Sequence, residues 1–262
     1  MKNNAIGIFD SGIGGTSIWK EVIKLLPQEN TIYLADSKNA PYGEKLPQEI
    51  ISLCIKNTEF LISKGCKLII VACNTATTNA IDYLRKNYNI SFIGIEPAIK
   101  PAALFSKTGA IGILATKGTL TSKLFEKTAK EYTQNIATIE QDGEGLVTLI
   151  EEGKLNSKEL HNLLRNYLNP MLNYNIDHLV LGCTHYPYLI PQIKKILGPS
   201  IKIIDSGEAV AKQTKAILEV QELLSTSSKK SIHNLYINTQ TNVLSKILSD
   251  VSVNFTIKKL DF

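Results

Sequence analysis

The chain has 262 residues, of which 44% are hydrophobic and 20% are charged, and its formal net charge is +5. That length and composition predict a globular protein of one or two domains, and no apolar run approaches the roughly 20 residues that span a bilayer. The first apolar stretch ends at Asp10, too soon for a signal peptide, so we expect a cytoplasmic protein whose four cysteines are free thiols.

Strand patterns alternate with helix patterns in the first part of the chain, as in a parallel-sheet α/β fold. The expected strands cover residues 5–11, 31–36, 67–74 and 90–97. The expected helices between them cover residues 16–27, 48–63 and 77–88.

The second part of the chain repeats three segments of the first. AIGIF at 5–9 returns as AIGIL at 110–114, LIIVACNTAT at 68–77 as HLVLGCTHYP at 178–187, and FIGIEPAIKP at 92–101 as IKIIDSGEAV at 201–210. The offsets at matched positions are 105, 110 and 109 residues, which indicates two similar α/β units in tandem.

The repeat places Cys73 and Cys183 at equivalent strand ends, each followed by polar residues. Ligands bind beyond the carboxyl ends of strands in open α/β sheets, so two facing units would bring both thiols to one cleft. We expect a helix N-terminus there to lower the thiol pKa and to bind a carboxylate. Two such thiols could remove a proton from one face of a carbon and return one to the other. A lone cysteine after an apolar strand is more often a buried filler, but two matched copies favour catalysis.

The glycine-rich segment FDSGIGG at 9–15 lies between a strand and a helix, as a phosphate loop would. It lacks the P-loop lysine, and Ser17 occupies the third glycine position of GxGxxG, so the nucleotide signal is weak. A turn that directs Asp10 and Ser11 into a cleft and a plain tight turn both stay open.

The remaining cysteines and histidines give weaker signals. Cys183, His185 and Cys73 could suggest zinc, but the usual ligand spacings are absent and we expect no metal. We assign Cys54 and Cys66 to packing. His178 precedes an expected strand, and we place it on the surface.

Six motifs in chain order together resemble the glutamate racemases. They are GIFDSGIGG at 7–15, LADSKNAPYGEK at 34–45, VACNTATT at 71–78, IGIEPAIKPA at 93–102, LVLGCTHYP at 179–187 and IDSGEAVA at 204–211. The resemblance implies two similar α/β domains with mainly parallel sheets, related by pseudo-twofold symmetry, with the active site in the cleft between them. It also implies a first domain of residues 1–97 and 210–262 and a second of residues 98–209, although the tail after about residue 225 carries no matched motif.

The resemblance also implies roles for individual residues. Cys73 would deprotonate D-glutamate and Cys183 L-glutamate, and both would be assisted by polar side chains. The implied catalytic residues are Cys73, Cys183, Asp10, His185 and Glu151, of which Glu151 is the less secure match. The implied substrate-binding residues are Asp10, Ser11, Tyr42, Gly43, Asn74, Thr75, Thr116, Thr119, Thr184 and His185.

The implied function is cofactor-independent interconversion of L- and D-glutamate, which supplies D-glutamate for bacterial peptidoglycan and so serves cell wall biogenesis and cell shape. We expect no cofactor, since no lysine that could hold pyridoxal phosphate lies at a repeated strand end. The expected partners are L- and D-glutamate and a second copy of the chain in a homodimer. We expect no membrane partner, and no nucleic-acid partner, because the lysines are scattered.

Two alternatives stay open at this point. One is another racemase of the same superfamily, above all an aspartate racemase; those relatives tend to have His after CNTA and Glu after the second CT, whereas this chain has Thr77 and His185. The other is a non-catalytic amino-acid-binding regulatory protein, which would need only the carboxylate-binding residues.

Overall fold

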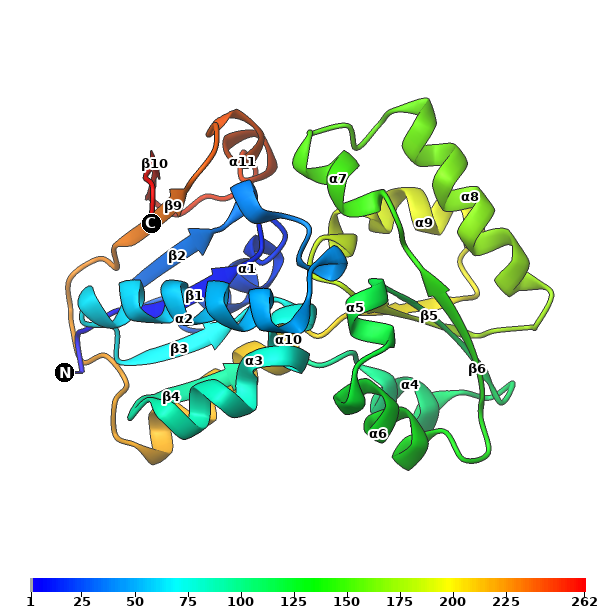
Figure 1. Cartoon of the computed structure of the whole chain (residues 1–262), viewed down its shortest axis with the longest axis horizontal. Helices are drawn as coiled ribbons and strands as arrows, with labels where there is room; N and C mark the ends of the chain where they lie inside the picture. The colour runs from blue at the N-terminus through cyan, green and yellow to red at the C-terminus, as the bar shows by residue number, and fades with distance from the viewer. Residues whose placement is uncertain (1) are drawn as a thin grey trace.

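The computed structural model describes residues 2–262 as two parallel β-sheets with helices on both faces (Figure 1). Over that range the larger sheet has the order β10-β9-β2-β1-β3-β4 and the smaller has the order β6-β5-β7-β8. The neighbouring strands are parallel throughout these residues. The predicted class of two α/β units with parallel sheets is therefore confirmed.

The strands of the larger sheet come from both ends of the chain. They are β1 (Ile6–Asp10), β2 (Thr31–Ala35), β3 (Leu68–Val71), β4 (Ser91–Gly94), β9 (His233–Ile237) and β10 (Phe255–Lys259). The associated helices and 3-10 turns are α1 (Thr16–Leu25), η1 (Ser37–Asn39), η2 (Tyr42–Glu44), α2 (Pro47–Ser63), α3 (Asn74–Asn87), α10 (Gly207–Val220) and α11 (Asn242–Ile247).

The smaller sheet is built from the middle of the chain. Its strands are β5 (Ala110–Ala115), β6 (Ala137–Asp142), β7 (His178–Gly182) and β8 (Lys202–Ile204). Its helices and 3-10 turn are α4 (Ile99–Phe105), α5 (Lys117–Leu120), α6 (Lys123–Tyr132), α7 (Leu146–Glu151), α8 (Lys158–Leu172), η3 (Tyr186–Leu189) and α9 (Ile190–Leu197).

The strand β3 shows why the central strands are apolar throughout. Successive side chains of a strand point to opposite faces of the sheet. Leu68 and Ile70 belong to the core beneath α1 and α10, whereas Ile69 and Val71 belong to the core beneath α2 and α3. Because helices cover both faces, each residue of LIIV is fully buried.

The two sheets repeat one topology. The order β2-β1-β3-β4 of the larger sheet corresponds to β6-β5-β7-β8 of the smaller, and the repeated sequences form β1 and β5, β3 and β7, and β4 and β8. Strands β9 and β10, from the tail without a matched motif, extend the larger sheet beyond β2. The domain boundaries after residues 97 and 209 stay a prediction, although α4 packs on β5 and β7 and α10 packs on α1.

One surface prediction was wrong. His178 is the first residue of β7 and is only 3% exposed. Its Nδ1 lies 2.7 Å from Oδ1 of Asp177, which gives this ring nitrogen a hydrogen-bond partner. Cys54 and Cys66 are buried free thiols, as the packing assignment predicted.

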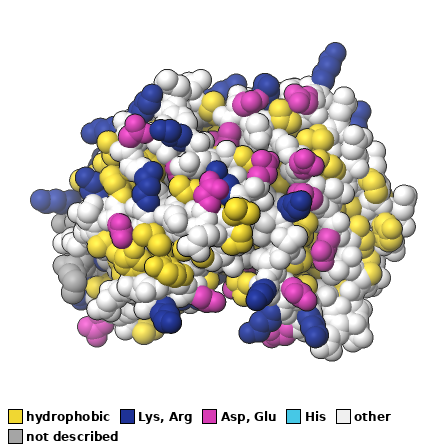
Figure 2. All heavy atoms as spheres, in the orientation of Figure 1, with side chains coloured by type: hydrophobic (Ala, Val, Ile, Leu, Met, Phe, Trp, Pro, Cys, Tyr) yellow, Lys and Arg dark blue, Asp and Glu magenta, His cyan; other side chains and the backbone are white. Residues whose placement is uncertain are grey.

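The surface has the mixed character that the scattered lysines predicted. Figure 2 shows Lys and Arg side chains interspersed with Asp and Glu over one face. Among the helices of residues 2–262, none combines the length and the apolar character that crossing a membrane requires.

Candidate active site

The carboxyl ends of the central strands of both sheets meet at one small cavity. Cys73 follows β3 and Cys183 follows β7, and both line this cavity. The other lining residues are Ser11, Pro41, Tyr42, Gly43, Asn74, Thr75, Thr116, Val147, Gly182, Thr184 and His185. The cavity volume is about 10 Å³, room for about one water molecule. The structure therefore describes a narrow, contracted site between the two units, which must widen to admit a molecule larger than water.

Cys73 is the N-cap residue of α3. Its Sγ accepts a hydrogen bond from the Ala76 N–H at 3.4 Å and donates to Oγ of Ser11 at 3.6 Å. The expectation of a lowered pKa was wrong: burial, together with the carboxyl of Asp10, raises the pKa of the Cys73 thiol well above its ordinary value. The N–H of the helix acts in the opposite direction but does not outweigh the loss of water. Cys73 is therefore a neutral thiol with a proton to give.

Cys183 is the first member of a chain of polar groups. Its Sγ lies 3.8 Å from Nδ1 of His185, and Nε2 of the same ring lies 2.6 Å from Oε1 of Glu151. Burial alone would lower the pKa of His185, but the adjacent Cys183 and Glu151 raise it well above its ordinary value. The ring is therefore an imidazolium at neutral pH, and its positive charge attracts negative charge on the sulfur.

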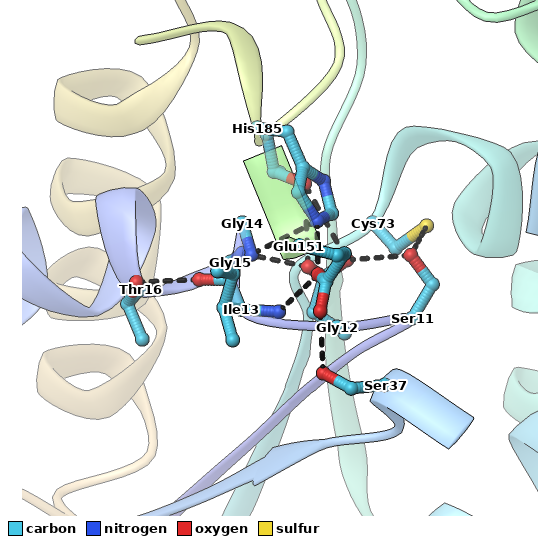
Figure 3. A network of polar contacts seen from close by, with 12 residues as sticks. Ser11, Gly12, Ile13, Gly14, Gly15, Thr16, Ser37, Cys73, Glu151 and His185 are labelled. Atoms are coloured by element: carbon cyan, nitrogen blue, oxygen red, sulfur yellow. Dashed lines mark hydrogen bonds and ion pairs between the residues drawn. The ribbon is translucent and has the colours of Figure 1, made fainter. Parts of the chain in front are cut away.

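Glu151 reaches from α7 of the second unit into the first unit, where two donors hold its carboxylate. The backbone N–H of Ile13 donates to Oε1 at 2.7 Å, and Oγ of Ser37 donates to Oε2 at 2.7 Å. Figure 3 shows the carboxylate enclosed between His185 on one side and the 11–16 loop and Ser37 on the other. The side chain is 14% exposed, so its hydrogen bonds compete little with water.

The glycines of FDSGIGG make room for these side chains. A Cβ on Gly12 would lie 1.9 Å from Oε1 of Glu151, and one on Gly14 would lie 2.2 Å from Nδ1 of His185. Such contacts are far inside van der Waals distance. The segment therefore allows close approach of the second unit, which explains its glycines without a phosphate.

Asp10, at the end of β1, is fully buried beside Cys73. Its Oδ2 accepts a hydrogen bond from the Gly15 N–H at 2.7 Å, and the Thr184 hydroxyl lies 3.4 Å from Oδ1. Burial raises the pKa of the Asp10 carboxyl to about 6. The carboxylate is therefore present at neutral pH, and a cation beside it would stabilise its charge.

Several donors around the cavity are unused or shared. Nδ2 of Asn74 is buried and has no partner. The hydroxyls of Thr75, Thr116 and Thr119 lie 2.9 to 3.4 Å from one another, so the three share their protons. These groups are suited to binding a carboxylate, because each can redirect a hydrogen bond to it.

Comparison with known proteins gives the family. The Asp/Glu/Hydantoin racemase model matches residues 12–214. The chain belongs to the Asp/Glu/hydantoin racemase family. Its relatives include the glutamate racemase of Herpetosiphon aurantiacus, 43% identical over 88% of this chain and 91% of that protein, and that of Clostridium perfringens, 44% identical over 92% and 94%.

Solved structures of racemases share the whole architecture. A glutamate racemase isoform of Bacillus anthracis superposes with a TM-score of 0.88 at 30% identity, over 100% of this chain and 98% of that one. The Francisella tularensis glutamate racemase, solved with D-glutamate, gives 0.84 at 29% identity over 100% and 98%. The resemblance to the glutamate racemases is thus confirmed, and with it the prediction of an isomerase of the amino-acid racemase type.

The structure brings together all the site residues inferred from the racemase motifs. Ten line the cavity or its wall, while Asp10, Thr119 and Glu151 lie directly behind it and contact lining residues. Their individual roles stay predictions. Within residues 2–262, no group of three or more His, Cys, Asp or Glu side chains is arranged to hold a metal ion.

Sequence reasoning missed the residues that hold these groups in place. Ser37 and Asp36 lie in the quoted motif LADSKNAPYGEK, so the resemblance to the racemases could have identified both. The hydroxyl of Tyr42 donates to Oδ2 of Asp36 at 2.5 Å, which ties the wall of the cavity to the end of β2. Asn238, which donates to the other oxygen of the same carboxylate, lies in the tail where no motif was recognised.

Proposed function

We propose that this protein is a glutamate racemase that uses Cys73 and Cys183 as two bases on opposite faces of the substrate α-carbon. The observation that carries the proposal is that equivalent strand ends of two repeated units deliver one thiol each to a single closed cavity. The substrate assignment is supported by the names of the relatives, among them the Escherichia coli glutamate racemase solved with L-glutamate and the activator UDP-MurNAc-Ala.

The two thiols differ in a way that suits one direction of the reaction. Cys183, whose sulfur lies 3.8 Å from Nδ1 of His185, is the base that takes the α-proton of L-glutamate. The Cα–H bond breaks, and its electron pair stays on the α-carbon. Cys73, a neutral thiol, then gives its own proton to the opposite face and leaves D-glutamate. The reverse reaction exchanges the two roles.

The surrounding polar groups bind the substrate and stabilise the carbanion. The carboxylate of Asp10 is the partner for the substrate ammonium group, whose charge compensates the burial of Asp10. Asn74, Thr75 and Thr184 donate to the α-carboxylate, over which the negative charge of the carbanion spreads. In a closed site these hydrogen bonds are stronger than in water.

The two alternatives have less support. A Picrophilus torridus aspartate racemase shares the fold, with a TM-score of 0.57 at 23% identity, which does not bear on substrate. A regulatory protein that only binds an amino acid would have no use for two thiols and the His185–Glu151 pair directed at one cavity.

The proposed physiological role is the supply of D-glutamate for peptidoglycan, and so for cell wall biogenesis and cell shape, by a cytoplasmic enzyme. Its support is the activator UDP-MurNAc-Ala, with which the Escherichia coli glutamate racemase was solved. The homodimer stays a prediction that analytical ultracentrifugation tests directly.

A circular dichroism assay of the purified, metal-free protein tests the proposal. L-Glutamate, D-glutamate, L-aspartate and L-alanine are supplied separately, and we expect the signal of both glutamate enantiomers to decay to zero while the other two persist. Cys73→Ala and Cys183→Ala should abolish the decay and remain folded. Cys66→Ala, which removes a buried thiol outside the cavity, is the matched control and should retain activity. Racemisation of L-aspartate at a comparable rate, or full activity in either cavity variant, would contradict the proposal.

A further inference from the structure

The amide side chain of Asn238 connects the C-terminal segment to the turn that follows β2. Strand β9 pairs in parallel with β2, and the register places Ile237 beside Ala35. The next residues along the two strands, Asn238 and Asp36, therefore lie side by side at the edge of the sheet where the active site is built. Asn238 is only 6% exposed.

Both ends of the Asn238 amide are used. Its Nδ2 donates to Oδ1 of Asp36 at 2.5 Å, and its Oδ1 accepts a hydrogen bond from the Lys38 N–H at 2.8 Å. A donor and an acceptor on one short side chain are both needed, since the carboxylate can only accept and the backbone N–H can only donate. Asn238 thus holds the turn of residues 36–39 in place through these two hydrogen bonds.

Two sets of hydrogen bonds connect that turn to the cavity. On one side, the hydroxyl of Tyr42, a lining residue, donates to the remaining oxygen of Asp36. On the other side, Ser37 donates to Glu151, which contacts His185. The imidazole of His185 in turn lies 3.8 Å from the sulfur of Cys183. One amide from the tail therefore supports both the wall of the cavity and the partner of one thiol.

We propose that Asn238 is a positioning residue for the proposed racemisation, holding the 36–39 turn so that Ser37 fixes Glu151 against His185 while Asp36 fixes Tyr42. The inference rests on the proposed function for its kinetic effect, but its structural effect on His185 is independent of it. It also gives the C-terminal segment a role at the active site besides extending the sheet.

Two substitutions at this position test the inference. Asn238→Ala removes both hydrogen bonds, and Asn238→Asp keeps the shape and the acceptor but sets a carboxylate against Asp36. The control is Asn234→Ala on the same strand, whose side chain accepts a hydrogen bond from Thr256 within the tail. Ser37→Ala and the double variant Ser37→Ala/Asn238→Ala complete a double-mutant cycle.

Three quantities are measured for each variant: kcat and KM for both glutamate enantiomers, the thermal unfolding midpoint, and the ring ¹⁵N resonances of His185. The chain has four histidines, which makes their assignment tractable. We expect both substitutions at 238 to lower kcat/KM about 10- to 100-fold in a protein that remains folded at 25 °C, since displacements of about 1 Å in a site have effects of this order. We expect the His185 resonances to move, and the double variant to show less than the sum of the single effects.

The outcomes separate the two proposals. Wild-type kcat/KM and unmoved His185 resonances in folded Asn238→Ala overturn the positioning role, as does an equal loss in Asn234→Ala. A lowered unfolding midpoint with normal kinetics and normal resonances shows a purely structural residue and also overturns it. If the wild type does not racemise glutamate but the His185 resonances still move, the proposed function fails while the link from Asn238 to the site stands.

Discussion

Replacing Glu151 by glutamine isolates the charge that supports His185. The amide is isosteric, its oxygen can still accept from Ile13 and His185, and its NH₂ can donate to Ser37. Geometry is therefore retained while the negative charge 2.6 Å from the imidazole is lost. We expect Glu151→Gln to fold normally and to racemise slowly.

The size of the effect follows from the charge-assisted hydrogen bond. A hydrogen bond to a charged group contributes about 1.5 to 3 kcal/mol, which corresponds to a loss in kcat/KM of about 10- to 150-fold. The pKa of His185, now raised partly by Glu151, should fall toward its ordinary value. Steady-state kinetics by circular dichroism and NMR titration of His185 measure the two effects.

The adjacent residue offers a matched control. Glu152 has the same chemistry, but its side chain is 46% exposed and pairs with Lys154 at 2.7 Å on the surface. Surface pairs of this kind contribute about 0 to 1 kcal/mol, so Glu152→Gln should change kcat/KM less than twofold. The reasoning is refuted if Glu151→Gln keeps the wild-type kcat/KM and His185 titration, or if both variants lose activity equally.

Three further predictions concern the same site. Gly14→Ala would place a Cβ 2.2 Å from His185, so the ring must move by about 1 Å, and we expect about a 100-fold loss of kcat/KM; full activity would show that the glycine is not needed for this approach. Asp10 keeps its proton up to about pH 6 in the native state but loses it near pH 4 in the unfolded state. The free energy of unfolding should therefore fall by up to about 3 kcal/mol as the pH rises from 4 to 6. Asp10→Asn should lack this decline. The free energy of unfolding is measured by urea titration at several pH values across this range, and an equal dependence on pH in both proteins would contradict the prediction. Dialysis against EDTA should leave the racemase rate unchanged, and restoration of a lost rate by zinc would contradict this.

The repeat in the sequence was sufficient to predict the two sheets and the meeting of the two thiols. Matched segments predicted that β3 and β7 occupy equivalent places, and the carboxyl ends of parallel strands bind ligands. The sequence alone therefore predicts that Cys73 and Cys183 lie at one cleft. Motif resemblance extended the prediction to Glu151, although the spacing of residues alone did not indicate it.

What could not be predicted depends on burial and on register between distant strands. The pKa of Cys73 is raised because burial removes water from the thiol and because Asp10 places negative charge beside it. The sequence pattern at the start of a helix indicates neither effect. The contact between Asn238 and Asp36 depends on the pairing of β9 with β2, and the two residues are 202 apart in sequence. His178 was placed on the surface because it was expected to precede the strand, whereas β7 begins at His178 and its pairing with β5 and β8 buries the residue.

The central claim, two thiols acting on opposite faces, is tested most directly by racemisation of L-glutamate in heavy water. If Cys183 takes the α-proton and Cys73 gives a different one, the first D-glutamate formed carries deuterium at the α-carbon, while the recovered L-glutamate stays largely unlabelled. A single base that serves both faces would leave original hydrogen in early product, or would label the L-glutamate pool as fast as product forms. Mass spectrometry of both enantiomers below about 10% conversion distinguishes the two outcomes. Each turnover transfers one proton or deuteron to the α-carbon, and the mass of the amino acid records which of the two it received. Early product that retains its hydrogen, or early labelling of the substrate, would contradict the account.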